Sequence, residues 1–221
     1  YVVTRASNAV VVDPEVDLTL LGPLGCGIQT GSGTVLNRLK PVVGESLVVF
    51  GCGAVGLSAI MAAKLTGCSQ IIAVDIHASR LALAGELGAT HQINGKEQDA
   101  VAVIKQITGK GAHYAVETTG VSAIVLQAVH AVKPLGTVAI VGFTGDITLN
   151  VQNDLMAEGK SLVGVIEGDA VPALFIPRLV QLYKQGKFPI DKLIARYPLA
   201  DINQAFADSA SGKVIKPVVV M

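Results

Sequence analysis

Short apolar runs alternate with amphipathic segments through the middle of the chain. Six of these runs predict buried β-strands, near residues 47, 71, 91, 113, 137 and 162. The segments between them place apolar residues at helical spacing, and they end at a glycine or just before a proline, as helices do. Strands that alternate with helices in this way predict an α/β fold, a doubly wound six-stranded parallel sheet with helices on both faces.

The two ends of the chain do not follow this alternation. The sequence LLGPLGCGIQTGSGTVLN, residues 20–37, predicts a helical approach that glycines interrupt. From residue 171 onward the pattern predicts a helix, a loop, a strand, a short helix and a last strand, and we expect Pro177 to kink or restart the first helix. The chain opens at Tyr1 inside a strand-like run, residues 1–12, and not at a methionine, so we expect it to be part of a longer protein.

The stretch VVFGCGAVGLSAIMAAK, residues 48–64, carries no charge before its last residue. A membrane-spanning helix needs about 20 apolar residues, and a glycine inside a helix costs about 1 kcal/mol relative to alanine. This stretch is shorter and has glycines at positions 51, 53 and 56. It therefore predicts a buried strand, a glycine turn and a helix that begins near Ala54, and we expect no membrane partner.

Gly51, Gly53 and Gly56 have the spacing G-x-G-x-x-G, and Asp75 closes the next strand. In a Rossmann-type turn the first glycine permits the tight bend, the second lets the backbone approach a pyrophosphate, and the third allows close packing. The helix N-terminus attracts the phosphates, while the carboxylate of Asp75 accepts hydrogen bonds from ribose hydroxyls and repels a 2′-phosphate. The motif predicts NAD as the cofactor, with NADP binding and a glycine turn that binds nothing as the alternatives.

The amino-acid composition limits the kinds of partner that the protein can bind. Lys plus Arg and Asp plus Glu number 17 each, so no basic excess supports binding to nucleic acid. Charged residues are 15% of the chain, below the usual share of about 25%, which indicates surface hidden against another domain or subunit. Three cysteines at irregular spacing do not form a disulfide framework. We expect a reduced, cytoplasmic protein.

Several longer pieces of the sequence resemble a known family. GCGIQTGSGTVLN, VFGCGAVGLSAIMAAKLTGCSQIIAVDIHASRLALAGELGAT, VETTG, GTVAIVG, GVIEGD and SGKVIKPVVVM occur in this order and cover most of the chain. They resemble the medium-chain, zinc-dependent alcohol dehydrogenases, and most of all the aryl-alcohol (benzyl alcohol) dehydrogenases. The resemblance implies that the whole protein oxidises a primary aromatic alcohol to an aldehyde by hydride transfer to NAD, with zinc as a Lewis acid.

The resemblance also implies roles for individual residues. Cys26 corresponds to a protein ligand of the catalytic zinc, and Phe143 and Ile166 are expected to face the substrate. With the glycine turn, the expected cofactor-binding residues are Thr30, Gly51, Gly53, Ala54, Val55, Gly56, Asp75, Arg80, Thr118, Thr119, Val141, Phe143 and Lys216.

Within this set, the resemblance distinguishes the two halves of the cofactor. Thr30, Val55 and Val141 correspond to contacts of the nicotinamide. Arg80 and Lys216 correspond to positions near the adenosine ribose and the phosphates. A lysine offers a point charge, whereas an arginine can form a bidentate contact with a phosphate. The phosphate-binding role of Lys216 is therefore less well defined than the role of Arg80.

The resemblance divides the chain into three parts. Residues 1–27 correspond to the end of a catalytic domain, residues 28–166 to the NAD-binding domain, and residues 167–221 to a segment that packs back on the catalytic domain. The other zinc ligands and a four-cysteine zinc lobe correspond to sequence upstream of Tyr1, so no catalytic residue is assigned in this chain. We therefore expect exposed apolar surface along both flanks.

The remaining cysteines and histidines receive plainer interpretations. Cys52 and Cys68 are expected to be small core residues, and Cys26 itself is either a zinc ligand or a buried free thiol. His77 contacts an adenine edge or lies in a solvated loop. The other three histidines have no metal-ligand spacing to another histidine or cysteine.

Two other functions remain open. The first is a zinc-free quinone or enoyl reductase of the same superfamily, against which Cys26 argues. The second is a non-catalytic nucleotide-binding or dimerisation module, and we expect this chain alone to bind NAD without turnover. The resemblance implies a homodimer or homotetramer formed through the edge strand SLVGVI, residues 161–166, since a bare strand edge invites pairing.

Overall fold

The computed structural model describes residues 3–221, so the first two residues of the strand-like run lie outside the described residues. Over residues 3–12 the chain forms one short 3-10 turn, η1 (Ala6–Asn8), and no strand. The predicted strand is wrong there because β-branched composition gives a strand only where a neighbouring strand pairs with it.

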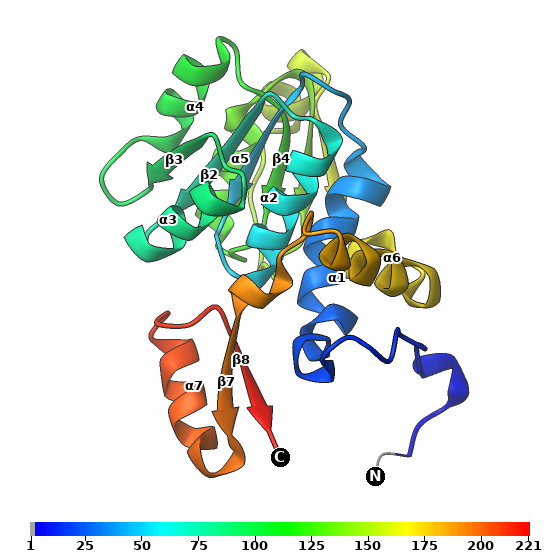
Figure 1. Ribbon diagram of the computed structural model, residues 1–221. Coiled ribbons are helices and arrows are strands. Elements are labelled where there is room, and N and C mark those ends of the chain that lie inside the picture. Colours follow the sequence, from blue (N-terminus) through cyan, green and yellow to red (C-terminus); the bar gives the residue numbers. More distant parts are fainter. Residues whose placement is uncertain (1–2) are drawn as a thin grey trace.

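Six strands form one parallel sheet (Figure 1), in the spatial order β3-β2-β1-β4-β5-β6. Every neighbouring pair is parallel. This order is that of the doubly wound dinucleotide-binding fold, so the predicted fold class is confirmed, with strands at all six predicted places. The strands are β1 (Ser46–Phe50), β2 (Gln70–Asp75), β3 (His91–Asn94), β4 (Ala112–Glu117), β5 (Val132–Ile140) and β6 (Ser161–Gly164).

The central strand β1 contributes side chains to two hydrophobic cores, one on each face of the sheet. Leu47 and Val49 pack into one core, whereas Val48 and Phe50 pack into the other. Successive side chains of a strand point to opposite faces, so a strand covered on both faces is uniformly apolar. The first core lies against α1 (Gly27–Gly33), α2 (Ala54–Thr66), α3 (Ala78–Leu87) and α6 (Pro172–Lys184), and the second against α4 (Ala100–Thr108) and α5 (Ser122–Ala131).

Strand β5 is longer and less regular than the sequence predicts. It begins directly after α5 at Val132, and its register against β4 shifts between Ala112 and Tyr114. Leu135, within this shifted stretch, has a φ of 65°. Pro134 is tolerated here because an irregular stretch of strand does not use every backbone N–H in the ladder.

The segments that flank the sheet contain the expected elements, with two corrections. The approach over residues 20–37 is helical, as predicted, but it is interrupted at Cys26, between Gly25 and Gly27, whereas Gly31 lies inside α1 without breaking it. Helix α6 continues through Pro177 without a restart, because buried Phe175, Ile176, Leu179 and Val180 hold its inner face on the core. The short 3-10 and π segments are η2 (Leu18–Leu20), η3 (Gly22–Gly25), η4 (Thr34–Leu39), η5 (Val151–Leu155), η6 (Met156–Glu158), η7 (Glu167–Asp169), η8 (Ile190–Leu193) and η9 (Leu199–Asp201).

A small lobe at the C-terminal end lies below the main sheet in Figure 1. It consists of the parallel pair β7 (Ile194–Pro198) and β8 (Lys216–Val220) with α7 (Ile202–Ala210) between them in the chain. Asp208 of α7 ties the lobe together, because it accepts hydrogen bonds from Tyr197 (2.7 Å) and Lys213 (3.1 Å).

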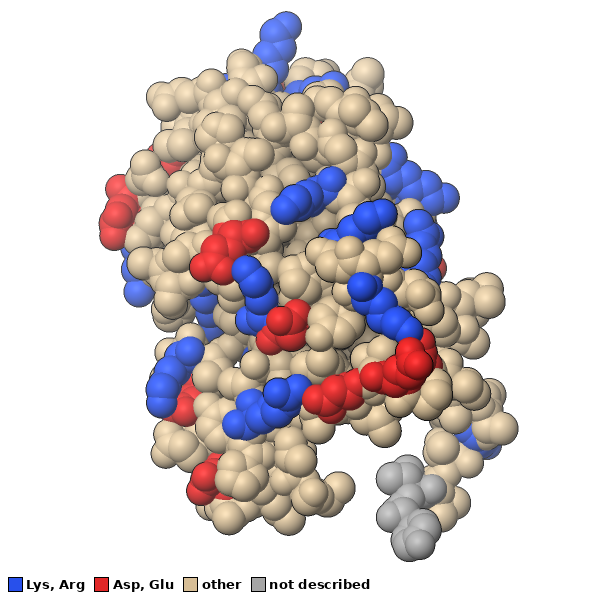
Figure 2. Space-filling view, viewed as in Figure 1, with Lys and Arg blue, Asp and Glu red and all other residues tan. Residues whose placement is uncertain are grey.

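Both flanks expose apolar side chains, among them Leu18, Leu174 and Phe206. The face in Figure 2 is largely uncharged, with Lys, Arg, Asp and Glu scattered over it. The expectation of apolar surface along the flanks is confirmed. Within residues 3–221, no helix combines the length and the apolar character that crossing a bilayer requires.

Candidate functional site

Two adjoining cavities open at the carboxyl ends of the strands of the main sheet. The larger has a volume of about 670 Å³ and the smaller about 400 Å³. Open parallel sheets bind ligands beyond the carboxyl ends of their strands, where the strand order reverses, which in this sheet is between β1 and β4. The two cavities share a wall made of Cys26, Gly27, Val55, Thr118 and Thr119.

The glycine turn between β1 and α2 contains three different environments. Gly51 has a φ of 90°, and a Cβ there would lie 2.6 Å from the hydroxyl oxygen of Thr118. A Cβ on Gly56 would overlap the carbonyl oxygen of Gly51, so this glycine lets the helix pack on the turn. Gly53 alone has open space around its Cβ position. The fold therefore requires the first and third glycines, whereas the second leaves room for a ligand.

Asp75 ends β2 and faces the larger cavity. Its side chain is held by backbone donors: Oδ2 accepts from Cys52 N (2.6 Å), and Oδ1 accepts from Ile76 N (2.7 Å) and His77 N (2.9 Å). A carboxylate offers about four acceptor positions. The backbone thus fixes this carboxylate while leaving capacity for ligand hydroxyls.

Two cationic side chains line the same cavity, Arg80 of α3 and Lys216 at the start of β8. The Arg80 Nε is buried and has no hydrogen-bond partner. A buried donor without an acceptor costs about 1–3 kcal/mol, so the fold holds this guanidinium in place at a cost, and its positive charge favours an anionic ligand in the cavity that Arg80 lines. His77 also lines this cavity, so a contact between its side chain and an adenine edge stays a prediction.

The loop after β4 separates the two cavities and is held by a buried acid. Glu117 has an exposed fraction of 0%. Its Oε1 accepts from Thr119 N (2.6 Å), from Gly120 N (3.2 Å) and from the hydroxyl of Thr119. Thr118 donates its hydroxyl to Gly51 O (3.0 Å), which ties this loop to the glycine turn. The sequence pattern alone had given no reason to assign a function to Glu117.

The smaller cavity has mostly apolar walls. Thr30 and Val141 line it, and the highly exposed side chains of Phe143 and Ile166 form its outer side. Glu167, to which the sequence pattern assigned no role, adds a carboxylate to this wall. It begins a turn, Glu167–Asp169, in which all three residues have a positive φ. Such geometry costs about 1–2 kcal/mol for each residue other than glycine.

The structure brings nearly all of the residues expected at the site to one of these cavities. Gly56 is the exception, because it packs behind the turn. Sequence reasoning missed several lining residues that no local pattern marks, among them Gly27, Gln127, Gly142 and Glu167. The larger cavity receives Gly51, Gly53, Ala54, Val55, Asp75, Arg80, Thr118, Thr119 and Lys216, and the smaller receives Thr30, Val141, Phe143 and Ile166.

The residues present do not fit zinc by themselves. Cys26 is exposed and lines both cavities, so the alternative of a buried free thiol is wrong. Across residues 3–221, no group of three or more His, Cys, Asp or Glu side chains is placed to hold a metal ion. Burial raises the pKa of the Cys52 thiol strongly and that of Cys68 to a smaller extent, as expected for packed thiols.

Comparison with known proteins agrees with the fold. The family described as zinc-binding dehydrogenase matches residues 54–185, more than half of the chain. This chain therefore belongs to the zinc-binding dehydrogenase family. The expected relation to zinc-type alcohol dehydrogenases is confirmed at this level.

Individual relatives are named for particular alcohols. Geraniol dehydrogenase from Castellaniella defragrans is 43% identical over 226 residues, which cover 100% of this chain and 60% of that protein. The crystal structure of benzyl alcohol dehydrogenase from Acinetobacter calcoaceticus has 51% identity and a TM-score of 0.95, over 98% of this chain and 60% of that one. An alcohol dehydrogenase zinc-binding domain protein from Burkholderia ambifaria has 52% identity and the same TM-score, over 98% of this chain and 59% of that one. The chain thus spans about 60% of these relatives.

Proposed function

We propose that this chain is the NAD-binding part of a zinc-dependent alcohol dehydrogenase that oxidises a primary aromatic alcohol to an aldehyde. The observation that carries the proposal is one cavity with an open glycine position, Gly53, and a carboxylate fixed by backbone N–H groups, Asp75. That pair suits a pyrophosphate beside a ribose with free hydroxyls. The positive charge of Arg80, which lines the same cavity, also favours an anionic ligand.

Each wall has a separate task in this proposal. The first turn of α2 has backbone N–H groups without helical acceptors, and with Gly53 it holds the pyrophosphate. Asp75 accepts from the ribose hydroxyls, and Arg80 and Lys216 add positive charge. The nicotinamide end enters the smaller cavity, where Thr30 and the apolar walls orient it and exclude water. NAD, when bound, supplies the hydride acceptor; the protein supplies orientation.

The substrate class rests on the smaller cavity and on the relatives. Phe143 and Ile166 present apolar surface at its outer side, which suits an apolar alcohol. Geraniol and benzyl alcohol, named in two relatives, are both primary alcohols. Cys26 would serve as one ligand of a zinc whose other ligands come from outside this sequence, so this chain alone binds the cofactor without turnover.

Calorimetry with NAD and NADP tests the cofactor proposal. Wild-type chain should bind NAD at least tenfold more tightly than NADP, a difference of about 1.4 kcal/mol or more. Asp75→Ala should weaken NAD binding and remove the preference, because the repulsion of a 2′-phosphate goes with the carboxylate. Failure to bind either dinucleotide, or tighter binding of NADP by the wild type, would contradict the proposal.

Two measurements separate the proposal from the alternatives. An active longer protein without zinc would indicate a quinone or enoyl reductase, which the family match and the exposed Cys26 both disfavour. Clear turnover of benzyl alcohol by this chain alone would show that its own residues suffice for catalysis. The cytoplasmic location and the three-part division of the chain stay predictions.

The edge of the sheet suggests how copies associate. Strand β6 pairs with β5 on one side, and its residues Leu162 and Val163 are partly exposed. We infer that a second copy pairs along this edge to form a dimer, since unpaired strand edges favour such addition. Sedimentation should give a dimer or tetramer. Val165 N donates to Ile140 O of β5, so the N–H of the preceding residue, Gly164, points to the free edge, and Gly164→Pro, which removes that donor, should shift the protein toward monomer. A monomeric wild type would contradict the pairing.

A further inference from the structure

The turn that follows β6 adopts a backbone that its side chains disfavour. Glu167, Gly168 and Asp169 have φ values of 49°, 69° and 48°, in a region that residues other than glycine seldom occupy. Such geometry persists where surrounding contacts impose it, and it clusters at functional sites. The turn comes directly after Val165 and Ile166, which line the smaller cavity.

Helix α1 and η4 hold the middle of this turn by backbone packing. A side chain on Gly33 would overlap the backbone of Gly168, and one on Gly168 would overlap the carbonyl oxygen of Gln29. Asn37 Nδ2 donates to Gly168 O at 3.0 Å. The middle of the turn is therefore fixed without any contribution from the side chain at position 167.

The carboxylate of Glu167 adds a separate contact, and it does so at the cavity wall. Its Oε2 accepts from Gln29 Nε2 at 2.9 Å, and the hydroxyl of Thr30 lies 3.5 Å from the same oxygen. Thr30 lines the smaller cavity with Glu167. This contact thus joins the strand-end wall of the cavity to the helix wall.

Gln29 is committed to this contact. The residue is 2% exposed, and its Nε2 also donates to Gly25 O at 3.1 Å. Its Oε1 is buried without a partner. Turning the amide over would place Oε1 against two acceptor oxygens, so the observed orientation keeps the bond to Glu167 although it leaves Oε1 unpaired.

We propose that Glu167 is a positioning residue for the nicotinamide end of NAD, an inference that rests on the proposed function. Its hydrogen bond to Gln29 holds residues 165–167 against Thr30 and so maintains the shape of the smaller cavity. Glu167 is not among the lining residues of the larger cavity. Its effect is therefore confined to ligands that reach the smaller one.

ADP-ribose, which lacks the nicotinamide, separates this role from a general structural one. Calorimetry on Glu167→Leu should show NAD binding weakened by about tenfold, the worth of a hydrogen bond to a charged group, and ADP-ribose binding within about twofold of wild type. Glu167→Gln keeps an acceptor oxygen for Gln29 and should retain NAD affinity within about threefold. Glu167→Gly, which relieves the backbone, should match the leucine variant and serves if that variant does not fold.

Asp169 provides the matched control. It has almost the same φ as Glu167, but its carboxylate lies 3.5 Å from the exposed Arg38 and does not line either cavity. Asp169→Leu should leave binding of both compounds unchanged. Equal loss of NAD and ADP-ribose affinity in Glu167→Leu, no loss of either, or a glutamine variant as weak as leucine would overturn the positioning role. A wild type that binds neither compound would overturn the proposed function and this role with it.

Discussion

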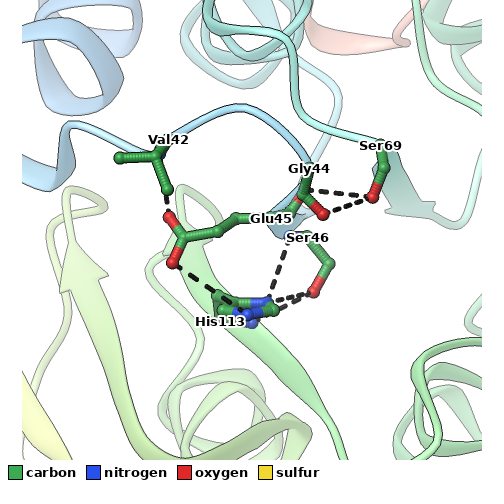
Figure 3. Close-up of polar contacts among 6 residues, drawn as sticks. All are labelled: Val42, Gly44, Glu45, Ser46, Ser69 and His113. Carbon is green, nitrogen blue, oxygen red and sulfur yellow. Dashed lines mark hydrogen bonds and ion pairs between the residues drawn. The ribbon is translucent and has the colours of Figure 1, made fainter.

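The two ends of the main sheet use polar side chains in opposite ways. At the carboxyl end, Asp75 and Glu117 accept mainly from backbone N–H groups of the following loop, and cavities remain beside them. At the amino end, polar side chains close on one another (Figure 3): Ser46 Oγ lies 2.8 Å from His113 Nδ1, and Glu45 Oε1 lies 4.0 Å from His113 Nε2.

The difference follows from what each end must satisfy. Ser46 N donates to His113 Nδ1 (3.2 Å) and His113 N donates to Ser46 Oγ (3.2 Å), so β1 and β4 are locked together with acceptors and donors matched. At the other end the loops satisfy the carboxylates, and among the described residues the Nε of Arg80, a residue that lines the larger cavity, is unpaired. An end whose groups satisfy each other serves stability, and an end with unpaired groups beside a cavity serves binding.

The largest effect is expected at the carboxyl end, from Gly56→Ala. The added Cβ overlaps the backbone of Gly51, so the free energy of unfolding should fall by about 3 kcal/mol or more, measured by urea denaturation. Gly53→Ala is the matched control, since its Cβ meets nothing within 4 Å. It should unfold like the wild type or later, yet lose NAD affinity by about tenfold because a methyl group would stand where the pyrophosphate approaches.

A Gly53→Ala variant with unchanged NAD affinity would show that no ligand backbone contact occurs at this turn. A Gly56→Ala variant of normal stability would show that α2 can shift away from the turn. Either result would remove the distinction between a glycine that the fold needs and a glycine that the ligand needs.

Glu117→Gln should have the next largest effect. The amide keeps one acceptor oxygen but loses the charge that strengthens the bonds to Thr119 and Gly120, so the unfolding free energy should fall by about 2 kcal/mol. NAD binding should weaken as well, because this loop separates the two cavities. Thr119→Ser keeps the hydroxyl and should behave like the wild type in both measurements. Normal NAD affinity in Glu117→Gln would show that the buried acid serves the fold alone.

The sequence was sufficient for the features that arise from local pattern. Both-face burial makes strands such as β1 uniformly apolar, and a strand–glycine turn–helix with Asp75 on the next strand has a spacing that can be read directly. Contacts between distant segments left no such mark. Ser46 meets His113 across 67 positions and Gln29 meets Glu167 across 138, and neither pairing has a periodicity.

Unusual backbone conformations were the second feature that could not be predicted from the sequence. Glu167 and Asp169 adopt positive φ although neither is glycine, because packing against α1 overrides local preference. The predicted restart of the helix at Pro177 and the predicted strand before residue 12 were both wrong, because tertiary contacts, or their absence, outweighed local propensity.

Ser46→Ala should have a smaller effect, confined to stability. The lost hydroxyl leaves the backbone N–H of His113 without its acceptor, while Ser46 N still donates to His113 Nδ1, so the unfolding free energy should fall by about 1 kcal/mol. NAD affinity should stay unchanged because the cavities lie at the opposite end of the strands. Ser69→Ala, which removes an exposed hydroxyl bonded to Gly44 O (2.6 Å) at the same end, should change stability by less than about 0.5 kcal/mol. Weaker NAD binding in Ser46→Ala would break the separation of the two ends.

The smallest effect concerns pH and again belongs to the amino end. Burial, helped by the positive charge of Lys133, lowers the pKa of His113 below its usual 6.5, and Glu45 opposes this shift. Between the lowered pKa and 6.5 the unfolded chain binds more protons, so stability rises with pH there. The stabilisation that neutral His113 contributes is complete above about pH 6.5 and is lost as pH falls toward its pKa in the folded protein.

Urea denaturation of wild type and His113→Gln from pH 5 to 8 measures this contribution as a difference in slope. The wild type should lose stability relative to the variant as pH falls below 6.5. Hydrogen bonds from Lys184, His130 and Tyr197 lower the pKa of Asp13, Asp154 and Asp208, respectively, from 3.8, so these carboxylates begin to lose their contribution only below about pH 5. Identical slopes would show that His113 titrates alike in the folded and unfolded states. If NAD affinity changed with pH in the same way, the amino end of the sheet would also influence binding at the carboxyl end.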